Sequence, residues 1–205
     1  MKMPIAKALF NSHPYIEYRK LVADLLRGEK STGNEQSPEL TLYSGLNETR
    51  MNLLEKTMKI SDDISQKLKS LKNQYIWLVI SEGWCGDSAQ LLPIFDAMAK
   101  ESDGKVDLKI VLRDENQELM NLFLTNKTKA IPKLIVINRE TGGAIAHWGP
   151  RPQGASDLID TYKKEHGAID QTAETELQMW YLHDKGESAQ NEISGMMLEV
   201  EAQLD

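Results

Sequence analysis

The sequence predicts an α/β protein with a central mixed β-sheet, flanking helices and helical extensions at both ends. Short apolar runs rich in β-branched residues occupy 75–81, 106–112 and 133–138, and their composition is typical of buried strands. A Thr-Gly-Gly turn at 141–143 then leads into a fourth strand at 144–148, joined as a hairpin. The segments between these runs have helical patterns, so helices can cover both faces of the sheet.

The core of this fold is predicted to span residues 73–166. One helix follows the first strand and begins near Cys85. A short helix is expected over 115–124, and a closing helix over 153–166. The resulting order is β-α-β-α-β-β-α, which is one layered domain.

Residues 1–72 are predicted to form a polar, helical N-terminal extension. Ser12 followed by Pro14 is a favourable helix start. A second helix is expected over 46–59. Ser61, followed by two aspartates, predicts the start of a third helix. The apolar residues of the second helix are expected to form its buried stripe: Leu46, Leu53, Leu54 and Met58.

Residues 167–205 are predicted to form an acidic helical C-terminal extension. Asp170 can cap a helix that carries Leu177 and Tyr181. Gly186 interrupts this pattern, and a last helix is expected after it.

The composition excludes several classes of function. The net charge of −7 gives no indication of nucleic-acid binding or of binding to an anionic membrane. No segment has the run of about 20 apolar residues that a membrane helix needs, and the first residues do not resemble a signal peptide. We therefore expect a cytoplasmic protein. One cysteine excludes an intrachain disulfide and a cysteine-rich zinc site, and the four histidines are scattered, so we expect no metal and no cofactor.

A short motif follows the first predicted strand. It reads Trp-Cys-Gly-Asp-Ser at 84–88 and runs directly into a helix that contains Pro93. Ile131 and Pro132 precede the third strand, and Gly149 follows the hairpin. Together these features resemble the thioredoxin family over about 73–166, which implies a thioredoxin-like fold. The Trp-Cys-Gly-Asp core is also similar to a bacterial subgroup with N-terminal helices, whose usual motif is WCGDC.

The motif places a thiol at the start of a helix. The unpaired N–H groups and the partial positive charge there stabilise a thiolate, so Cys85 is the candidate nucleophile. Ser88, one turn later, can donate its hydroxyl to the same sulfur. The resemblance implies a cis bond before Pro132, which would let the backbone of Ile131 pair with an extended peptide. It also implies a substrate groove shaped by the neighbouring residues Trp84, Gly86, Asp87, Ile131, Pro132 and Gly149.

Two departures from the family concern release of a bound partner. The second cysteine, which attacks the mixed disulfide, is replaced by Ser88. The buried acid on the preceding strand is replaced by Val79. Cys85 can still capture a disulfide, but an external thiol must then resolve the adduct. Asp87 has opposite effects, because its charge raises the thiol pKa while its position suits the helix N-terminus, and the sequence leaves the balance open.

The sequence leaves two functions open. The first is monothiol thiol–disulfide exchange, in which Cys85 forms mixed disulfides with a protein or low-molecular-weight thiol partner. The alternative is a non-catalytic protein-binding module that keeps the fold and uses its helical extensions for docking. Glu82 stands where one-cysteine peroxidases place a threonine, which disfavours that class. Whether the chain is an enzyme, and its oligomeric state, stay open.

Overall fold

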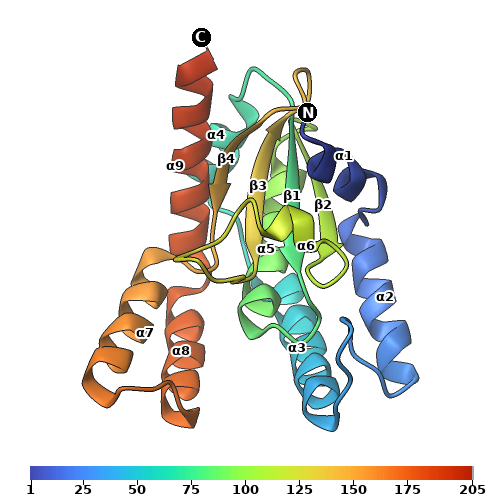
Figure 1. Cartoon of the computed structure of the whole chain (residues 1–205). Coiled ribbons are helices and arrows are strands. Elements are labelled where there is room, and N and C mark those ends of the chain that lie inside the picture. The colour runs from blue at the N-terminus through green and yellow to red at the C-terminus, as the bar shows by residue number, and fades with distance from the viewer. Residues whose placement is uncertain (205) are drawn as a thin grey trace.

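A computed structural model describes residues 1–204 and has a mixed sheet at its centre (Figure 1). The strands are β1 (Tyr75–Ser81), β2 (Val106–Leu112), β3 (Lys133–Asn138) and β4 (Ala144–Trp148). Their order in the sheet is β2-β1-β3-β4, with β1 parallel to β2 and antiparallel to β3. β3 and β4 form the predicted antiparallel hairpin. The predicted α/β fold with a central mixed sheet is confirmed.

Helices surround this sheet and continue beyond it at both ends of the chain. They are α1 (Met3–Phe10), α2 (Tyr15–Arg27), α3 (Pro38–Thr57), α4 (Asp62–Lys69), α5 (Gly86–Glu101), α6 (Gln117–Met120), α7 (Gln153–His166), α8 (Gln171–Asp184) and α9 (Glu187–Leu204). Figure 1 shows α6 in front of the sheet, α5 behind it and α9 alongside β4. Within residues 1–204, no helix is long and apolar enough to cross a membrane.

The two faces of the sheet bury separate apolar clusters. Alternate residues of β1 serve opposite faces, as the strand period requires. Trp77 and Val79 belong to the larger cluster, which includes residues of α5 and of the helices in both extensions. Leu78 and Ile80 belong to the smaller one, which α1 and α6 cover. Cys85 lies in this smaller cluster.

The first helix of the chain is not predicted by the sequence pattern. α1 buries Ile5 and Ala8 against the smaller cluster, and its start has no side-chain cap to reveal it. The predicted helix start at Ser12 is wrong. The Ser12 hydroxyl donates to the carbonyl of Leu9, 2.7 Å away, and α2 begins directly after Pro14.

The second predicted helix differs from the structure in both extent and orientation. α3 begins well before the predicted 46–59, because Ser37 caps it and a proline follows. Leu46 and Leu53, predicted to be buried, are 46% and 59% exposed, so that prediction is wrong. α3 buries instead a largely polar face made of Ser44, Asn47 and Met51.

Two other predicted helix starts agree with the structure. The Ser61 hydroxyl accepts from the backbone N–H of Ile64 at 3.3 Å, so α4 starts as predicted. Asp170 caps α8 by accepting from the N–H groups of Thr172 and Ala173. α6 is shorter than the predicted 115–124, because the residues on either side of 117–120 form turns and irregular structure.

The N-terminal extension is held together by a buried guanidinium. Arg19 of α2 donates to Glu48 of α3 at 2.7 Å and to Asn52 at 2.9 Å, and it also pairs with Glu55. Burial favours loss of the charge, but the hydrogen bond with the Glu48 carboxylate holds the pKa of Arg19 above its ordinary value. These contacts fix α3 beside α2, with its polar face toward the motif at the start of α5.

Candidate functional site

The predicted site residues meet where β1 runs into α5. Cys85 is the N-cap residue of α5, and its thiol donates to the carbonyl oxygen of Ile131 at 3.4 Å. The Ile131–Pro132 peptide bond is cis, and Trp84 packs against the same apolar cluster as Cys85 and Ile131. Gly149 lies against Pro132: a Cβ at Gly149 would come within 2.4 Å of the Pro132 carbonyl oxygen. The chain therefore brings these five residues together from three separate segments.

The Cys85 thiol is held in its protonated form. The residue is 8% exposed, and burial followed by the charge of Asp87 raises the pKa of Cys85 to about 11. The Ser88 hydroxyl and the N–H groups of Ser88 and Asp87 act in the opposite direction. The balance that the sequence left open therefore favours the thiol, because removal from water outweighs the stabilisation at the helix end.

Ser88 is buried immediately beside the sulfur. It is 1% exposed and lies in the first turn of α5, where its hydroxyl lowers the pKa of the Cys85 thiol. Within residues 1–204 its hydroxyl has no hydrogen-bond partner of ordinary geometry. An oxygen at this position cannot attack a mixed disulfide as a sulfur would, so Ser88 acts only on the environment of Cys85.

Asp87 joins the motif to the C-terminal extension. One carboxylate oxygen accepts from the Tyr181 hydroxyl of α8 at 2.8 Å. The other accepts from the Arg151 guanidinium, also at 2.8 Å, and the Asp87 side chain is almost fully buried. Burial and then the charge of Asp87 raise the pKa of Tyr181 well above its ordinary value, so Tyr181 stays a neutral donor. Asp87 thus holds α8 against the start of α5.

The N-terminal extension borders the other side of the motif. The Asn47 side chain of α3 donates to the carbonyl oxygen of Gly83 at 2.9 Å, and the N–H of Gly83 donates to the Thr32 hydroxyl at 2.7 Å. A Cβ at Gly86 would lie 3.9 Å from Arg50 of α3 and 3.8 Å from Gln178 of α8. Both extensions therefore reach the first residue of α5.

A second buried acid lies in the loop before the motif. Glu82 is fully buried, and its Oε1 accepts from the backbone N–H of Asp114 at 2.9 Å. Burial raises its pKa. Trp84, two residues later, carries the Arg113 guanidinium 4.8 Å from its ring centre. The loop after β2 is thereby fixed against the loop before α5.

Sequence reasoning missed three residues of this site: Asn47, Arg151 and Tyr181. Arg151 and Tyr181 lie 64 and 94 positions from Asp87 along the chain, so no local spacing relates them to it. Asn47 bonds a backbone carbonyl, and no side-chain pattern marks such a contact. No group of three or more His, Cys, Asp or Glu side chains within residues 1–204 could hold a metal ion.

Comparison with known proteins agrees with this architecture. A thioredoxin family model matches residues 33–163. A protein of unknown function from Pseudomonas aeruginosa, solved at 1.5 Å, has a TM-score of 0.57 at 19% identity, over 77% of this chain and 84% of that one. An HIV epitope scaffold has a TM-score of 0.55 at 16% identity, over 86% of this chain and 96% of that one. No curated protein matches the sequence significantly.

The structural similarities concern the fold alone, since both identities are low. The family match is more extensive. It begins before α3, includes the motif at 84–88 and the Ile131–Pro132 bond, and covers more than half of the chain. This chain belongs to the thioredoxin family.

Proposed function

We propose that this protein is a non-catalytic protein-binding module built on a thioredoxin fold, in which Cys85 remains a thiol. The observation that carries the proposal is the environment of the sulfur: Cys85 is 8% exposed, and its thiol donates to Ile131. Both helical extensions border the motif, through Asn47 and Tyr181. Cys85 and Asp87, which the resemblance to the family places in a substrate site, here make hydrogen bonds within the chain instead.

The protonation state makes exchange slow at neutral pH. Only the thiolate attacks a disulfide, and a thiol with a pKa of about 11 is almost entirely protonated at pH 7. The missing second cysteine removes the usual route of release as well. Docking of a partner protein on the exposed helices requires neither group.

Monothiol exchange is the second candidate, and one observation favours it. The Cys85 sulfur lies at the start of α5 beside the backbone of Ile131, the place where an extended disulfide partner would pair. In that reaction the Cys85 thiolate attacks one sulfur of the partner disulfide, forms a new S–S bond and releases the other sulfur as a thiolate. An external thiol then displaces Cys85.

Disulfide exchange with a small aromatic reagent separates the two functions. At pH 7 we expect the folded protein to react with 5,5′-dithiobis(2-nitrobenzoate) about two to three orders of magnitude more slowly than the same chain in denaturant, because its thiolate fraction is smaller by that factor. The rate is followed by the released coloured thiolate, and Cys85→Ser serves as the blank. A folded protein that reacts as fast as the unfolded chain, or faster, would support monothiol exchange instead.

A further inference from the structure

The outer face of α3 carries an exposed heptad pattern that no other described element covers. Residues with a spacing of three and four share one face of a helix, and this spacing defines the contact positions of a coiled coil. On α3 the series begins at residue 39 and ends at 56, and every member is exposed. We call this set the α3 seam: Glu39, Leu42, Leu46, Thr49, Leu53 and Lys56.

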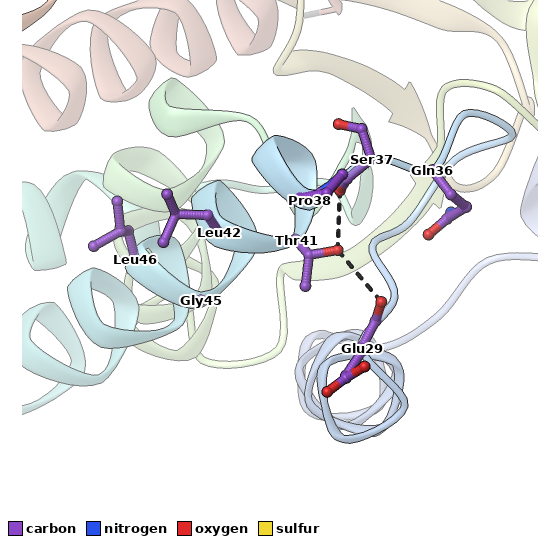
Figure 2. Close-up of a pocket in the computed structure, with 8 residues that line it drawn as sticks. All are labelled: Glu29, Gln36, Ser37, Pro38, Thr41, Leu42, Gly45 and Leu46. Carbon is purple, nitrogen blue, oxygen red and sulfur yellow. Dashed lines mark hydrogen bonds between the residues drawn. The ribbon is translucent and has the colours of Figure 1, made fainter.

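Between its charged ends the α3 seam carries three leucines and one threonine. Leu42, Leu46 and Leu53 are 64%, 46% and 59% exposed, although large apolar side chains are normally withdrawn from water. Figure 2 shows Leu42 and Leu46 next to each other on α3, directed away from Glu29 in the turn after α2. Three exposed leucines gathered on one face of a helix mark an interaction surface.

Concave surfaces lie on both sides of the seam. A pocket of about 770 Å³ borders its first half, between α3 and the loop after α2, and includes Leu42 and Gly45 (Figure 2). A groove of about 700 Å³ borders its second half, between α3 and α8, and includes Leu53 and Leu182. A helix laid along the seam would therefore meet apolar walls on either side rather than a flat surface.

The two ends of the seam have opposite charges. Glu39 stands at the N-terminal end, where hydrogen bonds to its own backbone and to Ser37 lower its pKa, so it is ionised at neutral pH. Lys56 stands at the C-terminal end. Neither side chain has an ion pair among residues 1–204.

The α3 seam is complementary to a second α3 seam that runs in the opposite direction. In an antiparallel pair of α3 helices related by a twofold axis, Glu39 faces Lys56 of the partner subunit. Leu42 then faces Leu53 of the partner subunit, and Leu46 faces Thr49 of the partner subunit. A parallel pair would place Glu39 against Glu39 of the partner subunit, and like charges in contact are destabilising.

We propose that a second copy of this chain docks antiparallel on the α3 seam and forms a twofold homodimer. Tyr43 is 45% exposed and lies two helical turns before Arg50, which lines the groove between α3 and α8. The same symmetry therefore directs Tyr43 toward this groove of the second copy. Met179 and Leu182, exposed on α8, extend the apolar wall of that groove. The dimer leaves Cys85 and its contacts unchanged, so an experiment that finds no dimer would not affect the proposal about the thiol.

Sedimentation equilibrium measures the association directly. We expect a mass that rises with concentration from the monomer value of 23.2 kDa to twice that value. Leu53→Glu should weaken association by about 100-fold or more, because it places a charge in the centre of an apolar contact. The matched control is Ile16→Glu, which alters an apolar residue on α2, outside the seam, that is 75% exposed, and this variant should leave the association unchanged.

Two results would overturn the dimer. One is a mass that stays at 23.2 kDa at every concentration up to the solubility limit. The other is an equal loss of association in Leu53→Glu and Ile16→Glu, which would place the contact elsewhere.

The register and direction are tested by a zero-length carbodiimide cross-link between a carboxylate and an amine. Within one α3 helix Glu39 and Lys56 are about 26 Å apart, so a cross-link between them must join two copies. In a mixture of ¹⁴N- and ¹⁵N-labelled protein, we expect mass spectrometry to find this cross-link between a light and a heavy peptide. A dimer without this cross-link would contradict the antiparallel register.

Charge exchange provides an independent check. Glu39→Lys alone should weaken the dimer by about tenfold, because lysine then faces lysine at both ends. The double variant with Glu39→Lys and Lys56→Glu should regain the wild-type association, since the pairs are restored in reverse. A double variant that is weaker than the single one would overturn the proposed pairing of these side chains.

Discussion

Gly149→Ala is expected to lower the free energy of unfolding by about 3–5 kcal/mol, because left-handed backbone strain and a clash with the backbone of Pro132 add. Gly149 has a φ of +109°, and its added Cβ would lie 2.4 Å from the carbonyl oxygen of Pro132. That oxygen belongs to the backbone, so no rotamer change can relieve the contact. The carbonyl of Gly149 also accepts from the buried Lys133 amine at 2.8 Å, and a shift of this segment would weaken that bond.

Gly167→Ala is the matched control for the conformational part of this effect. Gly167 ends α7 with a φ of +80°, and no atom lies within 4 Å of its added Cβ. We expect it to cost about 1 kcal/mol, the usual penalty for a side chain in the left-handed region. Chemical denaturation of both variants gives the comparison. Equal losses would show that the approach of Gly149 to Pro132 is not tight.

Asp87→Ala is expected to lower the free energy of unfolding by about 3 kcal/mol, as for removal of one partner from a buried ion pair. The variant leaves the Arg151 guanidinium and the Tyr181 hydroxyl without their shared acceptor. It also removes the second largest cause of the raised thiol pKa, so the pKa of Cys85 should fall. We therefore expect the free energy of unfolding to fall and the rate of thiol labelling to rise in the same variant.

Asp63→Ala is the corresponding surface control. Asp63 pairs with Lys67 on the exposed face of α4, and its side chain is 70% exposed. Exposed pairs of this kind contribute less than about 1 kcal/mol, so little change in stability and none in labelling are expected. If Asp87→Ala changed stability and labelling as little as this control, then Asp87 would not be the residue that holds α8 against the motif.

Local pattern predicted the sheet well because its strands are short apolar runs with turns at both ends. The three apolar runs at 75–81, 106–112 and 133–138 have the observed bounds of β1, β2 and β3. Side-chain caps were equally visible, as at Ser61 and Asp170, since a cap acts within three residues of itself. The motif at 84–88 indicated the start of α5 for the same reason.

The extensions show where such reasoning fails. Apolar spacing on α3 predicted a buried stripe with Leu46 and Leu53, yet α3 buries Asn47, because the Gly83 carbonyl offers a buried hydrogen bond. The exposed leucines carry the heptad pattern for another reason, which we assign to self-association. The contacts of Asp87 with Arg151 and Tyr181 depend on how distant segments pack, and composition does not encode that packing.

The pH dependence of Cys85 alkylation on the folded protein measures whether the buried sulfur is held as a thiol. A pKa of about 11 predicts a rate that keeps rising about tenfold per pH unit to well above pH 9, whereas the unfolded chain should level off near pH 8.5. Because the folded pKa is the higher one, stability should also decline as the pH rises between these two values. A folded protein whose rate levels off below pH 8 would show instead that Cys85 is an activated nucleophile.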